Sequence, residues 1–389
     1  MNLRLLSLTI LFTILSLPGS IHGAEPIPET APKPQTRRGL VSPEVLADRR
    51  VTFRLLAPAA TKVELAVMPT APQPMTRDAA GIWSVTSGAL EPEIYRYHFL
   101  VDGLRINDPL NPWIDTGRSS STSLFEIPGS PPRFDERRPG PSGTLQVRHY
   151  PSPVTGVSRR VFIHTPAAYD LEPTRQFPVL YLRHGNGDLE STWSELGRAG
   201  VILDNLVAEG RALPMLIVMP NGYPEGNDRG ASPPPGFGGE DATSAELLDV
   251  IIPLIERNYR VLSDPAQRAI AGLSMGGGQA FFTGLNHPDR FAWVAAFSSG
   301  AVGNKNFDIS AAIPGFIENP TATNARLRLL FLTCGTEDNR HAGHLQIVET
   351  LKKHGIHHEW HSLPGGHEWK VWRHSLAALL PRLFQPVPP

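Results

Sequence analysis

Cysteine and net charge are both scarce in this chain of 389 residues. Its one cysteine, Cys334, has no partner for an internal disulfide and lies in an apolar run typical of a strand. We interpret it as a small buried side chain and not as a nucleophile. The 36 Lys and Arg residues nearly cancel the 37 Asp and Glu residues, which leaves a net charge of -1. That balance argues against nucleic acid or an anionic membrane as a partner.

Nucleotide and metal motifs are missing as well. The chain has no G-x-x-x-x-G-K-S/T sequence, and no G-x-G-x-x-G lies between a strand and a helix with an acidic residue downstream. His357, Glu359 and His361 share one face of a predicted strand, but no third histidine or cysteine stands at a spacing suited to a metal. Polar residues that alternate on a half-exposed strand explain them better. We expect neither a cofactor nor a metal ion.

Long apolar segments are absent after the N-terminus. There, Arg4 precedes the apolar run Leu5–Leu17, and the stretch Pro18–Ala24 follows with small residues at its end. This order predicts a secretory signal peptide over residues 1–23, and the run is shorter than the ~20 apolar residues of a spanning helix. We therefore expect a secreted or periplasmic protein without a membrane anchor.

Proline, in contrast, is abundant, with 39 residues in the chain, about twice the usual ~5%. Residues 24–39 read as an extended Pro-rich linker. Residues 128–143 are rich in Pro, Gly and Arg and have too little apolar content to pack, so we expect few contacts from them and place a domain boundary there.

The two regions that these linkers delimit have different patterns. Residues 40–127 contain short segments in which apolar and polar side chains alternate, which predicts a small antiparallel β-sandwich. Residues 144–389 alternate continuous apolar strands, such as Pro178–Leu182 and Leu329–Thr333, with amphipathic helices. Continuous apolar strands indicate a sheet buried on both faces, so the pattern predicts an α/β domain with a mostly parallel central sheet.

The strongest catalytic signal is the G-x-S-x-G sequence centred on Ser274, at the end of a predicted strand and the start of a predicted helix. A serine displayed on such a sharp turn needs small neighbours, which Gly272 and Gly276 supply. The N–H of Met275 can then point at a developing oxyanion. We interpret Ser274 as a nucleophile.

A serine nucleophile needs a base and a carboxylate that orients the base. Asp338 and His367 follow Ser274 in the chain order of α/β-hydrolases, and each of the three lies just past the carboxyl end of a predicted strand. A second oxyanion donor is expected on the loop after Pro178–Leu182. Its glycines allow a close approach, and the N–H of either Asn186 or Gly187 can serve.

The catalytic half, from residue 144 to about 384, resembles the esterase D and feruloyl esterase family of α/β-hydrolases (carbohydrate esterase family 1 in its broad sense). The resemblance is carried by Pro178–Gly185, Val218–Gly222, Glu246–Tyr259, Ile270–Gly277, Cys334–Asp338 and Gly365–Trp369. It implies an α/β-hydrolase domain and places the acid three residues after Gly335, at Asp338 and not at its neighbour Glu337. Residues 51–109 look like an immunoglobulin-like E-set module, which implies a small sandwich ahead of the catalytic domain.

We therefore predict a secreted serine carboxylic-ester hydrolase that acts through an acyl-enzyme, with feruloyl or acetyl esters of plant polysaccharide as favoured substrates. A siderophore (enterochelin-type) esterase and an acyltransferase of the same fold are alternatives. A third, of a different class, is a carbohydrate-binding protein with an inactive hydrolase domain. Trp83 and Trp113 are candidates for sugar stacking, although such aromatics are more often core or interface residues. No feature of the sequence indicates an oligomeric state.

Overall fold

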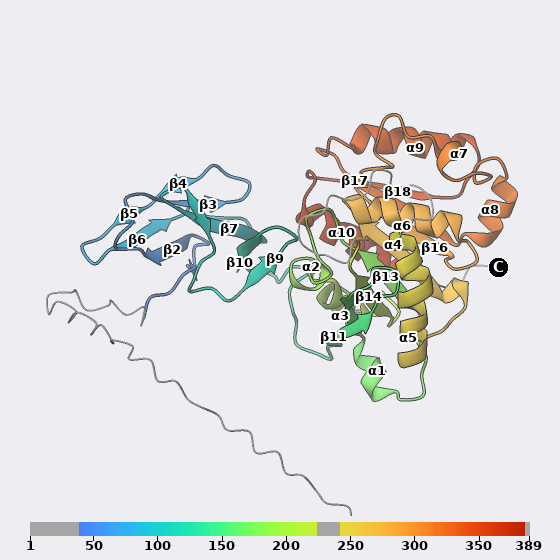
Figure 1. The fold of residues 1–389 in the computed structure, drawn as a ribbon, viewed down its shortest axis with the longest axis horizontal. Helices are drawn as coiled ribbons and strands as arrows, with labels where there is room; N and C mark the ends of the chain where they lie inside the picture. The colour runs from blue at the N-terminus through green and yellow to red at the C-terminus, as the bar shows by residue number, and fades with distance from the viewer. Residues whose placement is uncertain (1–38, 224–241, 386–389) are drawn as a thin grey trace, which may run out of the picture. The chain divides into compact units, whose positions relative to one another are not determined.

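Three β-sheets carry the described part of the chain, which comprises residues 39–223 and 242–385 of the computed structural model (Figure 1). From Leu40 onward these residues belong to one compact unit. The predicted signal peptide, residues 1–23, and the predicted linker, residues 24–39, lie outside the described residues except for Gly39.

The first two sheets are antiparallel and enclose a small apolar core. One has the order β1 (Glu44–Val45), β2 (Val51–Leu56), β6 (Ile82–Thr86), β5 (Thr76–Arg77). The other has the order β4 (Gln73–Pro74), β3 (Val63–Val67), β7 (Glu93–Val101), β10 (Ser121–Ile127), β9 (Ile114–Thr116), with β8 (Leu104–Ile106) paired to β7. The rings of Phe53 and Tyr97, from opposite sheets, lie 4.9 Å apart in this core. The all-β region is confirmed, and its immunoglobulin-like character stays a prediction.

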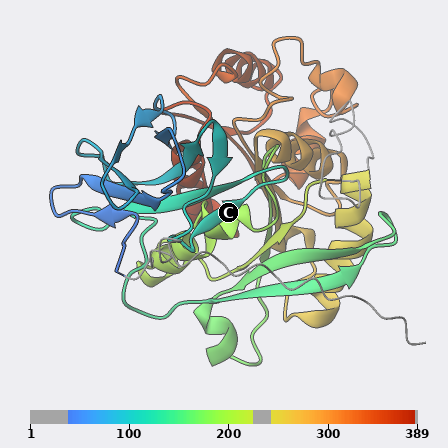
Figure 2. The same ribbon diagram turned by 60° about the vertical axis from the view of Figure 1, so that its left-hand side comes forward.

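The third sheet has eight strands and is mostly parallel. Its order is β11 (Thr144–Pro151), β12 (Ser158–Thr165), β14 (Leu216–Pro220), β13 (Val179–Arg183), β15 (Arg268–Leu273), β16 (Trp293–Phe297), β17 (Leu329–Gly335), β18 (Glu359–Leu363). The long strands β11 and β12 run antiparallel at one edge (Figure 2). All pairs from β14 to β18 are parallel, as the continuous apolar strands predicted.

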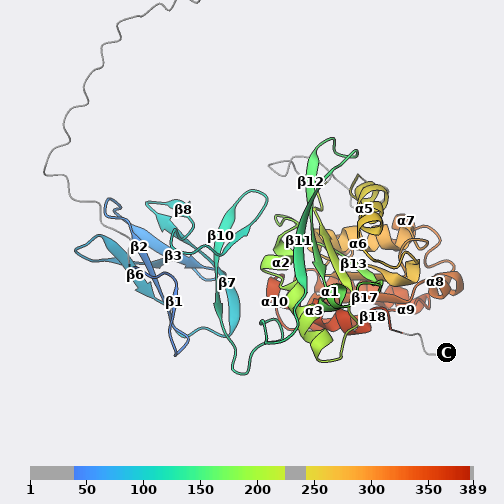
Figure 3. The same ribbon diagram turned by 90° about the horizontal axis from the view of Figure 1, so that it is seen from below.

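Helices cover both faces of this sheet. On one face lie α3 (Ala199–Ala208) and α10 (Trp369–Leu379), and on the other lie α5 (Ile252–Asn258), α6 (Ser274–Asn286) and α9 (His341–Lys353), as Figure 3 shows. Shorter helical elements are α1 (Ala167–Leu171), α2 (Thr192–Glu195), α4 (Ala242–Ala245), a π-helical segment (Glu246–Ile251), α7 (Ile309–Ala312) and α8 (Pro320–Arg326). Within the described ranges, no helix combines the length and apolar character needed to cross a membrane.

The segment 128–143 makes more contacts than its composition led us to expect. Asp135 is only 1% exposed and accepts from two cations, Arg133 Nε at 2.9 Å and Arg373 Nε at 2.7 Å. Arg373 on α10, also 1% exposed, is paired in addition with Glu93 of β7. The expectation of few contacts is therefore wrong, because buried charges hold this segment where apolar side chains do not. The domain bounds themselves stay a prediction.

We predict that Asp135→Asn lowers the free energy of unfolding by about 3–5 kcal/mol, because it removes one partner of a buried pair and leaves cationic Arg373 under-compensated. Asp48→Asn is the matched control, since Asp48 and Arg50 form an exposed pair. Exposed pairs contribute little to the free energy of unfolding, so the control should unfold almost as the wild type does. Urea unfolding of the two variants measures both values, and equal small losses would contradict the structural role given to Asp135.

Candidate active site

Ser274 lies on the turn where β15 ends and α6 begins, and its φ is +51°. This left-handed backbone is uncommon for a residue other than glycine and persists only where the surroundings impose it. A Cβ on Gly272 would lie 2.2 Å from the carbonyl oxygen of Gly276, and a Cβ on Gly276 would lie 2.3 Å from that of His184. Both positions therefore require glycine, and their close packing holds the serine on its strained turn.

Two further side chains complete a hydrogen-bonded chain with Ser274. His367, in the loop between β18 and α10, has Nε2 3.0 Å from Ser274 Oγ and Nδ1 2.6 Å from Asp338 Oδ2. Asp338 follows β17 and is buried, whereas the side chain of its neighbour Glu337 is exposed. The structure thus brings together the three residues selected from the sequence, although they lie up to 93 positions apart.

The charge of Asp338 follows from its contacts. Burial by itself raises the pKa of this carboxyl, but the hydrogen bond to His367 and the backbone N–H of Arg340 outweigh burial and hold the pKa well below its usual range. Asp338 is therefore an anion at neutral pH and accepts the Nδ1 proton of His367. That arrangement leaves Nε2 as the unprotonated nitrogen facing the serine hydroxyl.

The predicted oxyanion donors lie on two sides of Ser274. Met275 is the second residue of α6, where a backbone N–H has no partner within the helix. A Cβ on Gly185 would lie 3.5 Å from Ser274 Cβ, so the loop after β13 runs beside the serine. On that loop Asn186 and Gly187 are exposed, and the N–H of Gly187 donates to the hydroxyl of Tyr223 at 2.6 Å.

Two residues near this loop escaped the sequence analysis. Tyr223 is buried directly after the Asn221-Gly222 pair that follows β14. His184 is buried after β13, and its Nε2 accepts the N–H of Gly222 at 2.9 Å. Both residues follow the carboxyl ends of central strands, where ligands bind in open α/β sheets. That position in the sequence could have marked them as candidates for the site.

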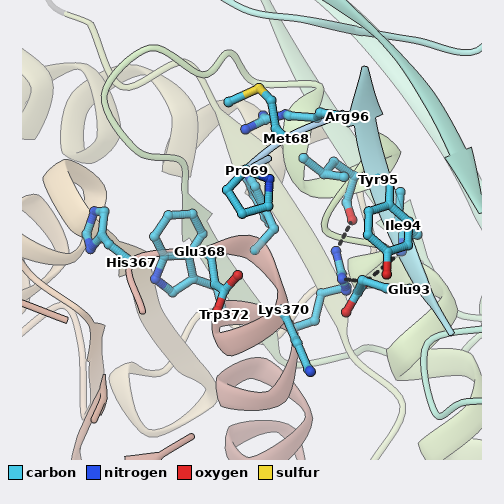
Figure 4. A pocket seen from close by; sticks show the side chains of 13 residues that line it. Met68, Pro69, Glu93, Ile94, Tyr95, Arg96, His367, Glu368, Lys370 and Trp372 are labelled. Atoms are coloured by element: carbon cyan, nitrogen blue, oxygen red, sulfur yellow. Dashed lines mark hydrogen bonds and ion pairs between the residues drawn. The ribbon is translucent and has the colours of Figure 1, made fainter. Parts of the chain in front are cut away.

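A pocket of about 290 Å³ lies beside His367 and includes side chains of the β-sandwich (Figure 4). Met68, Pro69 and Tyr95 line it from the sandwich, and Trp369 and Trp372 line it from α10. In the described part of the chain, the indole N–H groups of both tryptophans have no hydrogen-bond acceptor. Both indole nitrogens are buried, so the two tryptophans contribute aromatic walls to the pocket.

The other residues that the sequence analysis considered as nucleophile, metal ligands or sugar-stacking aromatics are buried or in contact with neighbouring side chains. Cys334 is buried, and burial raises the pKa of its thiol to about 12, so it stays protonated at neutral pH. Glu359 accepts from Arg382 Nε at 2.5 Å, and within the described ranges no group of three or more His, Cys, Asp or Glu side chains is placed to hold a metal ion. Trp83 lies in the sandwich core, and Arg198 packs over the ring of Trp113.

Comparisons with known proteins match this chain to esterases. Residues 152–383 match the model of the family described as "Putative esterase". An endo-1,4-beta-xylanase/feruloyl esterase from Xylanibacter ruminicola is 30% identical over 374 residues, which are 94% of this chain and 49% of that protein. An esterase from Mycobacterium tuberculosis is 28% identical over 251 residues, 54% of this chain and 53% of its own length. The chain spans about half the length of these curated relatives.

Solved structures extend the likeness to the fold. A ferulic acid esterase is 26% identical with a TM-score of 0.53, over 64% of this chain and 99% of that chain. The enterobactin esterase of Shigella flexneri, crystallised with 2,3-di-hydroxy-N-benzoyl-serine, is 19% identical with a TM-score of 0.60, over 87% of this chain and 93% of its own. The predicted α/β-hydrolase fold is confirmed.

Because His184 is buried in its neutral state, we expect the free energy of unfolding to depend on pH. Burial lowers the pKa of His184 to about 4, below the ~6.5 of an unfolded histidine. Its contribution to stability is therefore present above pH ~6.5 and is lost as the pH falls from there towards about 4. We expect the free energy of unfolding to fall between pH 7 and pH 4.5 by a few kcal/mol more in the wild type than in His184→Gln, which keeps an acceptor for Gly222 but takes up no proton.

Urea unfolding at several pH values measures this difference. His287→Gln serves as a control, because His287 lies outside the buried core. Parallel pH profiles for the wild type and His184→Gln would show that protonation of His184 has no part in acid destabilisation.

Proposed function

Since this chain belongs to the esterase family, we propose that it is a secreted serine carboxylic-ester hydrolase that acts through an acyl-enzyme. The observation that carries the proposal is the hydrogen-bonded chain Ser274–His367–Asp338, with its 3.0 Å and 2.6 Å contacts. Secretion rests on the predicted signal peptide, residues 1–23.

The proposed reaction proceeds in two halves. His367 Nε2 takes the proton of Ser274 as Oγ attacks the ester carbonyl carbon, and the oxyanion accepts hydrogen bonds from the N–H of Met275 and from the loop after β13. His367 then gives its proton to the leaving alcohol. Water attacks the acyl-enzyme with the same base, and Asp338 holds the imidazole in the required tautomer throughout.

The favoured substrates are feruloyl or acetyl esters of plant polysaccharide. The relative with 30% identity, which matches 94% of this chain, carries feruloyl esterase in its name. The pocket beside His367 adds a physical argument. Because His367 protonates the leaving oxygen, the alcohol lies on its side of the serine, where the aromatic walls of the pocket suit the apolar face of a sugar ring.

A siderophore trilactone is the second candidate substrate. The enterobactin esterase of Shigella flexneri shares the fold over 87% of this chain, beyond the residues that match the family model. The predicted signal peptide argues against it, because siderophore hydrolysis in this family is usually a cytoplasmic task.

We expect the purified full-length chain to hydrolyse methyl ferulate or acetylated xylan faster than a siderophore trilactone. Ser274→Ala should fold and lose turnover by roughly 10⁴–10⁶-fold, because no other group replaces the nucleophile. Ser194→Ala is the matched control, since Ser194 is a half-buried serine that donates to the carbonyl of Ser191.

Each result of this experiment has a clear meaning. Faster hydrolysis of the trilactone selects the siderophore alternative, and product formation only with an added acceptor alcohol selects acyl transfer. A wild-type chain without turnover on any ester supports the carbohydrate-binding alternative. Full turnover by folded Ser274→Ala would refute the serine mechanism.

A second prediction separates the two adjacent carboxylates. Asp338→Asn should lower kcat by roughly 10⁴-fold, because an amide favours the wrong tautomer of His367. Glu337→Gln should change kcat little, since the Glu337 side chain is exposed. Kinetics on one soluble ester compare the folded variants. If Glu337→Gln proves to be the impaired enzyme, the orienting acid lies one residue earlier than proposed.

A further inference from the structure

Tyr223 contacts both flanks of the proposed oxyanion hole. Its hydroxyl accepts the N–H of Gly187 at 2.6 Å and lies 3.4 Å from Asn186 Oδ1, to which it can donate. Its ring forms a small buried apolar cluster with Leu189 and Met275. One side chain therefore connects the loop after β13 with the residue that follows Ser274.

The β-sandwich reaches the same place through the turn between β9 and β10. The backbone N–H of Arg118 donates to the carbonyl oxygen of Gly187 at 2.8 Å. The guanidinium carbon of Arg118 lies 4.0 Å from the centroid of the Tyr223 ring, a cation–π contact. Gly187 is thus held on both sides, with its N–H on Tyr223 and its carbonyl on Arg118, while its φ of +88° suits only glycine.

This geometry distinguishes the two candidate donors. A backbone N–H has a single hydrogen, and that of Gly187 is committed to a short bond with Tyr223. Asn186 is exposed, and among the described residues its N–H has no acceptor. The Asn186 N–H is therefore the group available to an incoming oxyanion beside Ser274.

We propose that Tyr223 and Arg118 are positioning residues that hold Gly187, so that the N–H of Asn186 completes the oxyanion hole. The inference rests on the proposed serine mechanism and deepens it. It also gives the β-sandwich a part in catalysis, because Arg118 belongs to the sandwich and acts on the loop of the catalytic domain. Neither residue touches the reacting atoms; each acts through the loop.

The test is Tyr223→Phe, which keeps the ring and removes the hydroxyl that accepts from Gly187 and can donate to Asn186. We expect kcat to fall roughly 10–100-fold with KM within about threefold, because a small displacement of an oxyanion donor weakens binding of the transition state alone. Tyr169→Phe is a matched control. The Tyr169 hydroxyl also accepts a backbone N–H, from Arg260 at 3.1 Å, and Arg260 also packs over its ring.

A trifluoromethyl ketone separates positioning from a general loss of structure. Ser274 Oγ adds to its carbonyl carbon, the serine proton passes to His367, and the former carbonyl oxygen becomes an anion in the oxyanion hole. We expect its inhibition constant in Tyr223→Phe to rise by the same factor by which kcat/KM falls. The binding of the acid product, which forms no oxyanion adduct, should stay unchanged.

The contribution of the sandwich is tested with Arg118→Ala. We expect kcat to fall by roughly threefold to tenfold with little change in KM, since the cation–π contact on the Tyr223 ring is lost while the backbone bond to Gly187 remains. Arg77→Ala, which removes a sandwich arginine bonded to the carbonyl of Pro58, should leave kcat unchanged.

Several outcomes would overturn the inference. Wild-type kcat and inhibition in Tyr223→Phe would remove Tyr223 from the proposal, and a raised KM with unchanged kcat would make it a substrate-binding residue instead. If Tyr223→Phe fails to fold, wild-type kcat in Arg118→Ala is the overturning result.

The Ser274→Ala variant distinguishes failure of this inference from failure of the serine mechanism. Activity retained by Ser274→Ala refutes the serine mechanism itself, whereas an inactive Ser274→Ala with an unimpaired Tyr223→Phe refutes only this inference.

Discussion

The close approach of backbone at the turn between β15 and α6 is the constraint on which the rest of the site depends. Gly276 lies so near the carbonyls of Arg183 and His184 that no side chain fits there, which locks the start of α6 onto the end of β13. The same contact therefore fixes Ser274 on its left-handed turn and sets where the loop after β13 begins. A neutral, buried His184 then ties that point to Gly222 and so to β14.

Buried ion pairs are the second constraint, because they join the sandwich to the α/β half of the chain. Arg373 lies on α10, the helix that starts two residues after His367, and it is paired with Glu93 of the sandwich and with Asp135 of the connecting segment. Asp188, on the loop after β13, faces Arg96 of β7, and burial raises its pKa to about 7. Buried ionic contacts of this kind tolerate few alternative arrangements, since an unmatched charge in the interior is costly.

Much of this molecule could be predicted from short stretches of sequence. The apolar runs of the central strands, the glycines around Ser274 and the order of Ser274, Asp338 and His367 each depend on neighbours within a few residues or on chain order. The prediction of few contacts for residues 128–143 was wrong because composition shows only how little apolar surface this segment has. Composition does not show that Arg373, more than 230 positions away, meets Asp135. Tyr223 and Arg118 were missed for the same reason.

By itself, the sequence determined the α/β class, the antiparallel region ahead of it and three residues that meet in one site, because periodicity and turn chemistry are local properties of the chain. Only the tertiary structure decided that the Gly187 N–H is committed to Tyr223, that the sandwich contacts the loop after β13, and that aromatic side chains of both regions line one pocket beside His367. Those contacts join residues far apart along the chain, and their partners are chosen by packing in three dimensions, which no local pattern encodes.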